Sequence, residues 1–241
     1  MYVLINEGLG QPPPEERQPD IVRIILIDPA GILKNSNKLR EDFRSKLEDK
    51  FNNLDPNWLK QANLRFRVGY RSNELSIEEK TRSGTLDFPV YLLAQQHGYK
   101  TVWDYMTQHK IPKTVNNQDI YDIAKKCFEQ KDTWGCGIPS GKGSRKVGFI
   151  KTHRILEAAT GNLWQAFVIA TAHEIGHMGN RLQHSTKGLM KYPVPLNVDI
   201  DFDKGDKSLF LSDLQRLRRL REETSLNRPK PKIRKFQWVF R

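Results

Sequence analysis

The chain of 241 residues is long enough for one large domain or two small ones with a substantial core. Its 37% hydrophobic content fits a folded globular protein, and we expect no membrane span because no run of about 18 apolar residues is present. The two cysteines, Cys127 and Cys136, exclude a disulfide-rich scaffold and allow at most one bridge.

The net charge of +12 is concentrated near the C-terminus, where residues 213–241 hold ten Lys/Arg against three Asp/Glu. Such a segment attracts polyanions but does not indicate a fold. We divide the chain into an extended, proline-rich lead-in (1–20), a folded domain (21–227) and a basic, aromatic tail (228–241). The lead-in lacks the features of a secretory signal, so we expect a cytoplasmic protein as given, or a secreted one whose leader was removed.

The first part of the domain predicts a crossover unit. Residues 21–28 form a β-branched run that is typical of a strand. Residues 37–54 carry apolar side chains at four-residue spacing and predict an amphipathic helix. Residues 64–70 alternate apolar and basic side chains, as a half-exposed strand does. Strand, helix and strand in this order favour a parallel pair.

The middle of the chain predicts short helices at 98–109 and 117–130, a loop at 134–144 and a strand at 145–156. A helix that is apolar nearly all round, and therefore buried, follows from residue 161 onwards. Gly179 and Asn180 are expected to end it, because both tolerate the left-handed conformation of a helix C-cap.

The last predicted helix begins at Ser212. Ser212 and Gln215 have the spacing of a capping box, and a leucine-patterned segment follows them. We therefore expect this helix to be the final regular element before the basic tail.

The sequence HEIGH at 173–177 indicates a metal site. Side chains four residues apart on a helix differ by about 40° in direction, so His173 and His177 can face one ion. Glu174 lies beside them, where it can accept a proton from metal-activated water, and zinc suits imidazole ligands. The alternative is a chance match, but a buried helix and a further histidine, His184, favour a real site.

The segment 173–193 resembles the metzincin clan of zinc endopeptidases. The resemblance rests on HEIGH, the glycine-containing turn after it, HS at 184–185 and GLMKYP at 188–193. His184 comes one residue later than the third ligand of that clan, and Asn180 stands where the clan has glycine. We prefer His184 as the third ligand. Its rivals are a ligand from a partner molecule, or one of three downstream acids: Asp199, Asp201 and Glu222.

The resemblance implies an α+β, zincin-like fold: a mixed twisted sheet, a buried active-site helix and a C-terminal helix. It also implies that Met190 packs beneath the ligands, although an ordinary core methionine is the simpler alternative. Tyr192 would touch zinc or stabilise an oxyanion, or else serve only in packing. Residues 148–151 would form the edge of the cleft that pairs with an extended peptide.

Two features stay open. Cys136, in CGIP, resembles the cysteine-switch segment of matrixin propeptides, but we favour an ordinary loop cysteine. The tail 228–241 either docks on the core, which we prefer, or binds nucleic acid through its aromatic and basic side chains.

These patterns together predict a zinc metalloendopeptidase with Glu174 as its general base and a peptide or protein as its substrate. The alternatives are a zinc-containing binding protein on the same scaffold, or a protease acting on nucleic-acid-bound proteins through the basic tail. The sequence does not indicate an oligomeric state.

Overall fold

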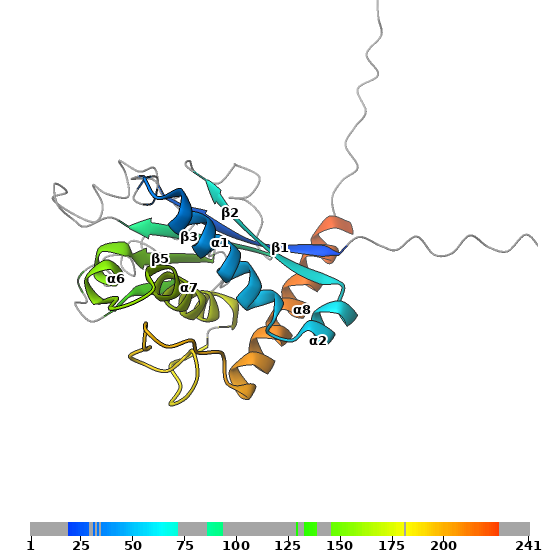
Figure 1. Cartoon of the computed structure of the whole chain (residues 1–241). Coiled ribbons are helices and arrows are strands. Elements are labelled where there is room, and N and C mark those ends of the chain that lie inside the picture. Colours follow the sequence, from blue (N-terminus) through cyan, green and yellow to red (C-terminus); the bar gives the residue numbers. More distant parts are fainter. Residues whose placement is uncertain are drawn as a thin grey trace, which may run out of the picture.

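The computed structural model describes residues 19–28, 31, 33, 35–71, 86–93, 129, 133–138, 146–180 and 182–226. These residues form a five-stranded sheet and five helices (Figure 1). The predicted short helices at 98–109 and 117–130 lie outside the described residues, apart from the helical Glu129, and so does the tail 228–241.

The sheet has the strand order β2-β1-β3-β5-β4. Its strands are β1 (Asp20–Ile27), β2 (Leu64–Arg71), β3 (Asp87–Leu93), β4 (Gly135–Ile138) and β5 (Val147–Lys151). The neighbours from β2 to β5 pair in parallel, whereas β4 pairs antiparallel with β5. The prediction of a mixed sheet is therefore confirmed, as is the parallel pair formed by the first two predicted strands.

Helix α1 (Asn37–Asn52) connects β1 to β2 and begins at a side-chain cap, where the Ser36 hydroxyl accepts from the Leu39 N–H at 3.3 Å. Its buried residues are Phe43, Leu47 and Phe51, which recur every four positions. This spacing places them on one face of the helix, as the sequence predicted.

Side chains of α1 cover the outer edge of β2. The Asn52 amide donates to the Phe66 carbonyl at 3.2 Å and accepts from the Phe66 N–H at 2.9 Å. The Glu48 carboxylate accepts from the Val68 N–H at 2.9 Å. These bonds replace those of a neighbouring strand, so this edge of the sheet is protected against pairing with another chain.

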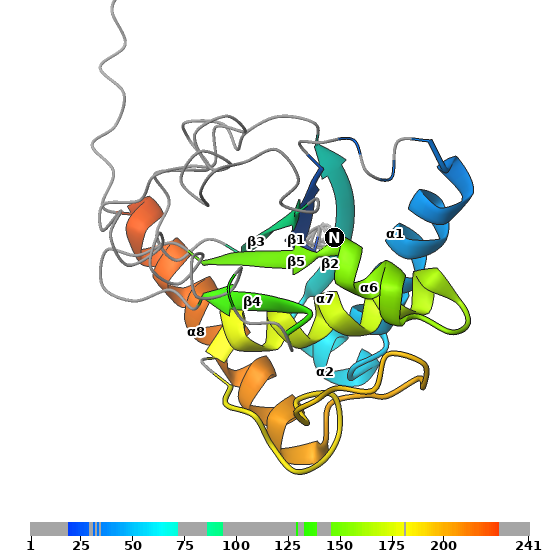
Figure 2. The same cartoon turned by 90° about the vertical axis from the view of Figure 1, so that its left-hand side faces the viewer.

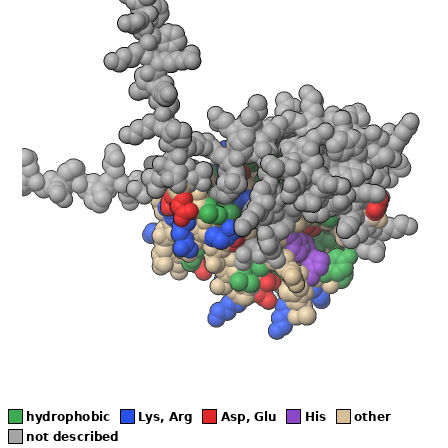
Figure 3. Space-filling view, turned by 180° about the vertical axis from the view of Figure 1, so that it is seen from behind, with side chains coloured by type: hydrophobic (Ala, Val, Ile, Leu, Met, Phe, Trp, Pro, Cys, Tyr) green, Lys and Arg blue, Asp and Glu red, His purple; other side chains and the backbone are tan. Residues whose placement is uncertain are grey.

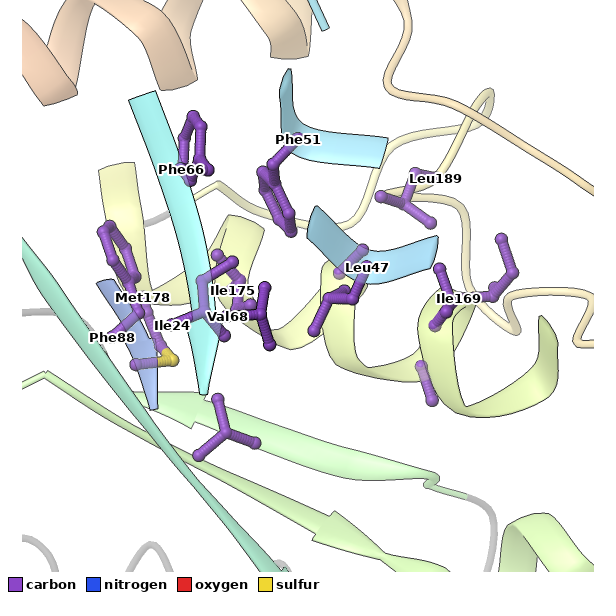
Figure 4. Close-up of a cluster of buried hydrophobic side chains, with 14 of the residues drawn as sticks. Ile24, Leu47, Phe51, Phe66, Val68, Phe88, Ile169, Ile175, Met178 and Leu189 are labelled. Atoms are coloured by element: carbon purple, nitrogen blue, oxygen red, sulfur yellow. The ribbon is translucent and has the colours of Figure 1, made fainter. Parts of the chain in front are cut away.

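The core lies between one face of the sheet and the helices α1, α7 (Leu163–Asn180) and α8 (Lys204–Leu226) (Figure 4). Figure 4 shows aromatic and branched side chains from three strands meeting those of α1 and α7. Phe210 of α8 reaches the same core, with its ring centroid 6.2 Å from that of Phe88. This core holds α7 rigidly beneath the sheet, which matters because α7 carries the HEIGH segment.

The structure corrects two predicted elements before α7 and the predicted conformation of Gly179, although α7 does end at Asn180 as expected. The predicted strand 145–156 is the shorter β5 followed directly by helix α6 (Thr152–Ala158), where the Thr152 hydroxyl donates to the Leu93 carbonyl at 2.6 Å. The predicted loop 134–144 contains strand β4. Gly179 is not in the left-handed conformation: among the described residues, positive φ occurs at Gly31, Asn63 and Gly188.

Gly179 has a packing role instead. A Cβ at this position would lie 2.6 Å from the Phe210 ring, so the glycine lets α8 approach α7 closely.

The predicted start of the last helix at Ser212 is also wrong, because α8 already begins at Lys204. The Asp203 carboxylate accepts from the Asp206 N–H at 2.8 Å and caps the helix there.

Lys146 is a buried lysine close to α8. Its ammonium lies 3.8 Å from the centroid of the Phe88 ring. Burial lowers its pKa to about 7, while Asp87 and Asp213 act in the opposite direction. In the unfolded chain the pKa of a lysine is about 10.4. Between about pH 7 and this value, the unfolded state therefore binds more protons than the folded state.

Stability should therefore rise as the pH is raised from about 7 towards about 10. We expect Lys146→Met to abolish this rise and to increase the free energy of unfolding at neutral pH by on the order of a few kcal/mol. Urea unfolding of the wild type and of Lys146→Met at about pH 7 and about pH 10 measures both effects. The exposed Lys60→Met is the control. An identical pH dependence in wild type and Lys146→Met would contradict the assignment.

Candidate metal centre

Helix α7 places the two histidines of HEIGH on the side that faces the loop after it. A Cβ on Gly176 would lie 2.6 Å from the Met190 sulfur, so this glycine lets the methionine pack directly against the helix between the two histidines. Met190 is fully buried. It thus forms an apolar support next to His173 and His177.

Three imidazoles meet at this point. The Nε2 atoms of His173 and His177 are 3.1 Å apart. The ring centroid of His184 lies 5.3 Å from that of His173 and 4.9 Å from that of His177. One ring nitrogen from each histidine lies within 4.8 Å of the other two. Figure 3 shows histidine side chains reaching the surface next to hydrophobic ones. Three converging nitrogens fit the ligand set of a catalytic zinc, which leaves a position open.

Backbone carbonyls orient two of the rings. The Nδ1 of His173 lies 2.7 Å from the Leu189 oxygen, and the Nδ1 of His177 is hydrogen-bonded to the Leu182 oxygen. A carbonyl can only accept, so each Nδ1 carries the proton and each Nε2 keeps its lone pair for a metal ion.

The three imidazoles also favour their neutral form. Burial, with smaller effects from His177 and His184, lowers the pKa of His173 to about 3, although its hydrogen bond to Leu189 opposes the shift. Burial lowers the pKa values of His177 and His184 as well. A metal ion must displace protons from charged ligands, whereas a neutral imidazole already offers a lone pair to it.

Glu174 lies next to this cluster and is buried, at 4% exposure. Burial raises the pKa of its carboxyl group to about 8, while a hydrogen bond from the Gly137 N–H and the charge of Lys151 lower it. A carboxyl group of this kind can take up and release a proton near neutral pH, as a general base requires.

Strand β4 packs against α7 at Glu174 (Figure 2). A Cβ on Gly135 would lie 2.9 Å from the Glu174 side chain, and one on Gly137 would lie 2.1 Å from the Glu174 carbonyl oxygen. Only glycine permits this approach. Neither glycine was expected to be a site residue, because both lie in a segment whose sequence predicts a loop.

The hydrogen-bond register defines the free edge of β4. The Lys151 N–H donates to the Trp134 carbonyl at 2.8 Å, so in this antiparallel pair the backbone groups of Gly135 and Gly137 point away from β5. The prediction that residues 148–151 form the edge of the cleft is therefore wrong: β5 pairs on both sides, with β3 and β4. Among the described strands, β4 is the edge on this side.

We expect Gly137→Ala to displace β4 from α7 and to lower the free energy of unfolding by about 1–3 kcal/mol, because the new methyl group meets backbone that cannot move independently. Gly161→Ala is the matched control, since nothing lies within 4 Å of its Cβ. Chemical unfolding of both variants measures the difference, and equal stability of the two would show that the close approach is not required.

The three acids that rivalled His184 lie elsewhere. Asp199 and Asp201 pair with the Lys50 ammonium at 3.1 and 2.7 Å. Glu222 pairs with Arg218 at 3.3 Å on α8. Among the described residues, the three histidines form the one group of this kind able to hold an ion.

Tyr192 lies beside the cluster, with its ring stacked on His184 at 4.6 Å between centroids and 44% of its surface exposed.

Cys136 lies in β4 and is disulfide-bonded, whereas Cys127, the only other cysteine of the chain, lies outside the described residues. The expectation of an ordinary loop cysteine is thus corrected, and a bonded sulfur offers no thiolate to a metal.

No model of a known protein family matches the sequence, and no curated protein matches it. The structure is similar to the crystal structure of archaemetzincin from Methanopyrus kandleri. The TM-score is 0.45 and the sequence identity 11%, over 80% of this chain and 96% of that chain. This likeness is too slight to transfer an activity to this chain.

No described helix has the length and apolar character needed to cross a membrane.

Proposed function

We propose that this protein is a zinc-dependent metallopeptidase whose metal is held by His173, His177 and His184. One observation carries the proposal: three neutral imidazoles converge within 4.8 Å of one another, beside the buried carboxyl group of Glu174. A structural zinc site normally has four protein ligands, whereas this cluster supplies three and leaves room for water or substrate.

Bound zinc would polarise the scissile carbonyl and lower the pKa of water. Glu174 would accept the proton of the attacking water and later deliver it to the leaving amine. The hydrogen bond from the Gly137 N–H holds its carboxyl group between β4 and the histidines. Tyr192, whose ring stacks on His184, would donate a hydrogen bond from its hydroxyl group to the oxygen that becomes negative.

The substrate in this proposal is an extended peptide that lies along β4. The outward N–H and C=O groups of Gly135 and the C=O group of Gly137 would bind its backbone as a further strand does, while the Gly137 N–H stays with Glu174. Such recognition depends on backbone geometry, so it accepts many sequences. This arrangement supports a peptidase over the alternative of a binding protein.

The test combines metal content with hydrolysis. We expect about one zinc per chain after dialysis against a weak chelator, and cleavage of an unfolded protein such as casein that stops after zinc removal and returns when zinc is restored. Bound zinc without cleavage of casein or a mixed peptide library would favour the binding protein. A protein without zinc would refute both.

A further inference from the structure

The backbone forms a tight turn at residues 188–191, which the Lys191 N–H closes by donating to the Gly188 carbonyl at 3.1 Å. Gly188 has a φ of +62°, a conformation that residues with a side chain rarely adopt. A Cβ there would lie 2.6 Å from the Asp203 nitrogen and 2.8 Å from the Asp201 oxygen. Only glycine therefore lets this turn lie directly against the backbone that leads into α8.

Leu189, the second residue of the turn, is held at both ends of its backbone. Its N–H donates to the Asp201 carbonyl at 2.7 Å, and its own carbonyl accepts from the Nδ1–H of His173 at 2.7 Å. The Asp201 carboxylate is anchored in turn, 2.7 Å from the buried ammonium of Lys50. The bond to Leu189 uses only the backbone of Asp201, however, so it does not require that side chain. The contact that orients His173 thus continues through Leu189 to the segment before α8.

Met190, the third residue of the turn, reaches the loop of the third histidine. The Ser185 N–H donates to the Met190 carbonyl at 2.9 Å, and Ser185 follows His184 directly in the chain. The adjacent carbonyls of Leu189 and Met190 therefore hold a ring of α7 and the backbone beside His184. Two histidines from different segments receive their relative position from one turn.

We propose that Gly188 is a positioning residue for His173 and His184. Its positive φ and missing side chain seat the turn so that two adjacent carbonyls hold these ligands, one directly and the other through the neighbouring backbone. This role presupposes the proposed metal site, which Gly188 itself does not contact. Removing an outer partner of a metal ligand typically costs about 10- to 100-fold in metal affinity. A displaced turn should act at that scale.

Gly188→Ala tests this role on the ligands themselves. We expect zinc binding to weaken by about 10- to 100-fold in chelator competition, and the visible spectrum of the cobalt-substituted protein, which reports ligand geometry, to change. In the metal-free protein, the nitrogen NMR spectrum of the histidines reports which ring nitrogen carries the proton. His173 should lose its preference for a proton on Nδ1. His177 should keep that preference, because its acceptor is the Leu182 carbonyl outside the turn.

A second variant keeps Gly188 and removes a single donor. Replacing Leu189 by its α-hydroxy analogue puts an ester oxygen in place of the N–H that binds the Asp201 carbonyl. The side chain and the glycine stay as they are, so this variant also serves if Gly188→Ala does not fold. We expect it to weaken zinc binding and to disturb the proton on His173 in the same direction.

Gly161→Ala and Asp201→Ala are the controls. The first adds a methyl group where nothing lies within 4 Å, and the second leaves the backbone carbonyl in place, so both should bind zinc like the wild type. Unchanged affinity, spectrum and His173 proton in both test variants would overturn the role of Gly188 while the metal site stands. Equal disturbance of His173 and His177 would overturn it too, because a general loosening moves both. A wild-type protein that binds no zinc would refute the metal site itself.

Discussion

Glu174→Gln is expected to bind zinc like the wild type and to hydrolyse peptides roughly a hundred- to ten-thousand-fold more slowly. The amide has nearly the shape of the carboxyl group, so it fits the same space between β4 and α7. It cannot accept a proton from water, and this step alone is lost. Zinc stoichiometry and the rate constant kcat on one peptide substrate, measured for both proteins, test the expectation.

The matched control is Glu157→Gln, the same substitution at an exposed position of α6 that pairs with Arg154. It should leave kcat unchanged. Hydrolysis near the wild-type rate in Glu174→Gln would remove Glu174 from the mechanism. Loss of zinc in that variant would instead mean that the carboxyl group supports the metal site.

The sequence predicted those elements whose side-chain pattern repeats over many residues. Helix α1 has four-residue apolar spacing, and β1 is a β-branched run, so both appear within two residues of their predicted limits. Such repeats reflect burial of one face, which the amino-acid sequence encodes directly. The parallel pairing of β1 and β2 followed from their connection by a helix.

The elements that were missed owe their conformation to distant contacts. Strand β4 contains two glycines in four residues, which suggests a loop, but those glycines are needed because α7 lies against them. Strand β3 has Pro89 in its interior, where proline removes a ladder donor and argues against a central strand. Helix α8 starts before Ser212 because Asp203 caps it, whereas the capping-box spacing favoured Ser212.

The candidate site shows the same division. His173, Glu174 and His177 lie on one helix, so spacing alone placed them together. The peptide-binding edge was predicted on β5 instead of β4, because the order in which strands pair cannot be deduced from local sequence. His184 depends on a loop, whose path the sequence leaves open, and the structure brings it to the other two histidines.

His184→Ala is therefore the decisive test of the ligand set. We expect it to weaken zinc binding by more than the roughly 10- to 100-fold that the loss of an outer-shell partner costs, because a donor atom itself is removed. His184→Asp should recover part of the affinity, since carboxylate is also a zinc ligand. The zinc content of both variants after dialysis against a weak chelator tests these two expectations.

The acids provide the contrast that makes this result specific. Asp199→Ala, Asp201→Ala and Glu222→Ala should keep their zinc, because the first two acids pair with Lys50 and the third with Arg218. If His184→Ala held zinc like the wild type while one acidic variant lost it, the third ligand would be a carboxylate and the loop would have to refold around the ion. His173, His177 and Glu174 could still form a hydrolase centre, since a carboxylate completes a two-histidine zinc site as well as a third imidazole does.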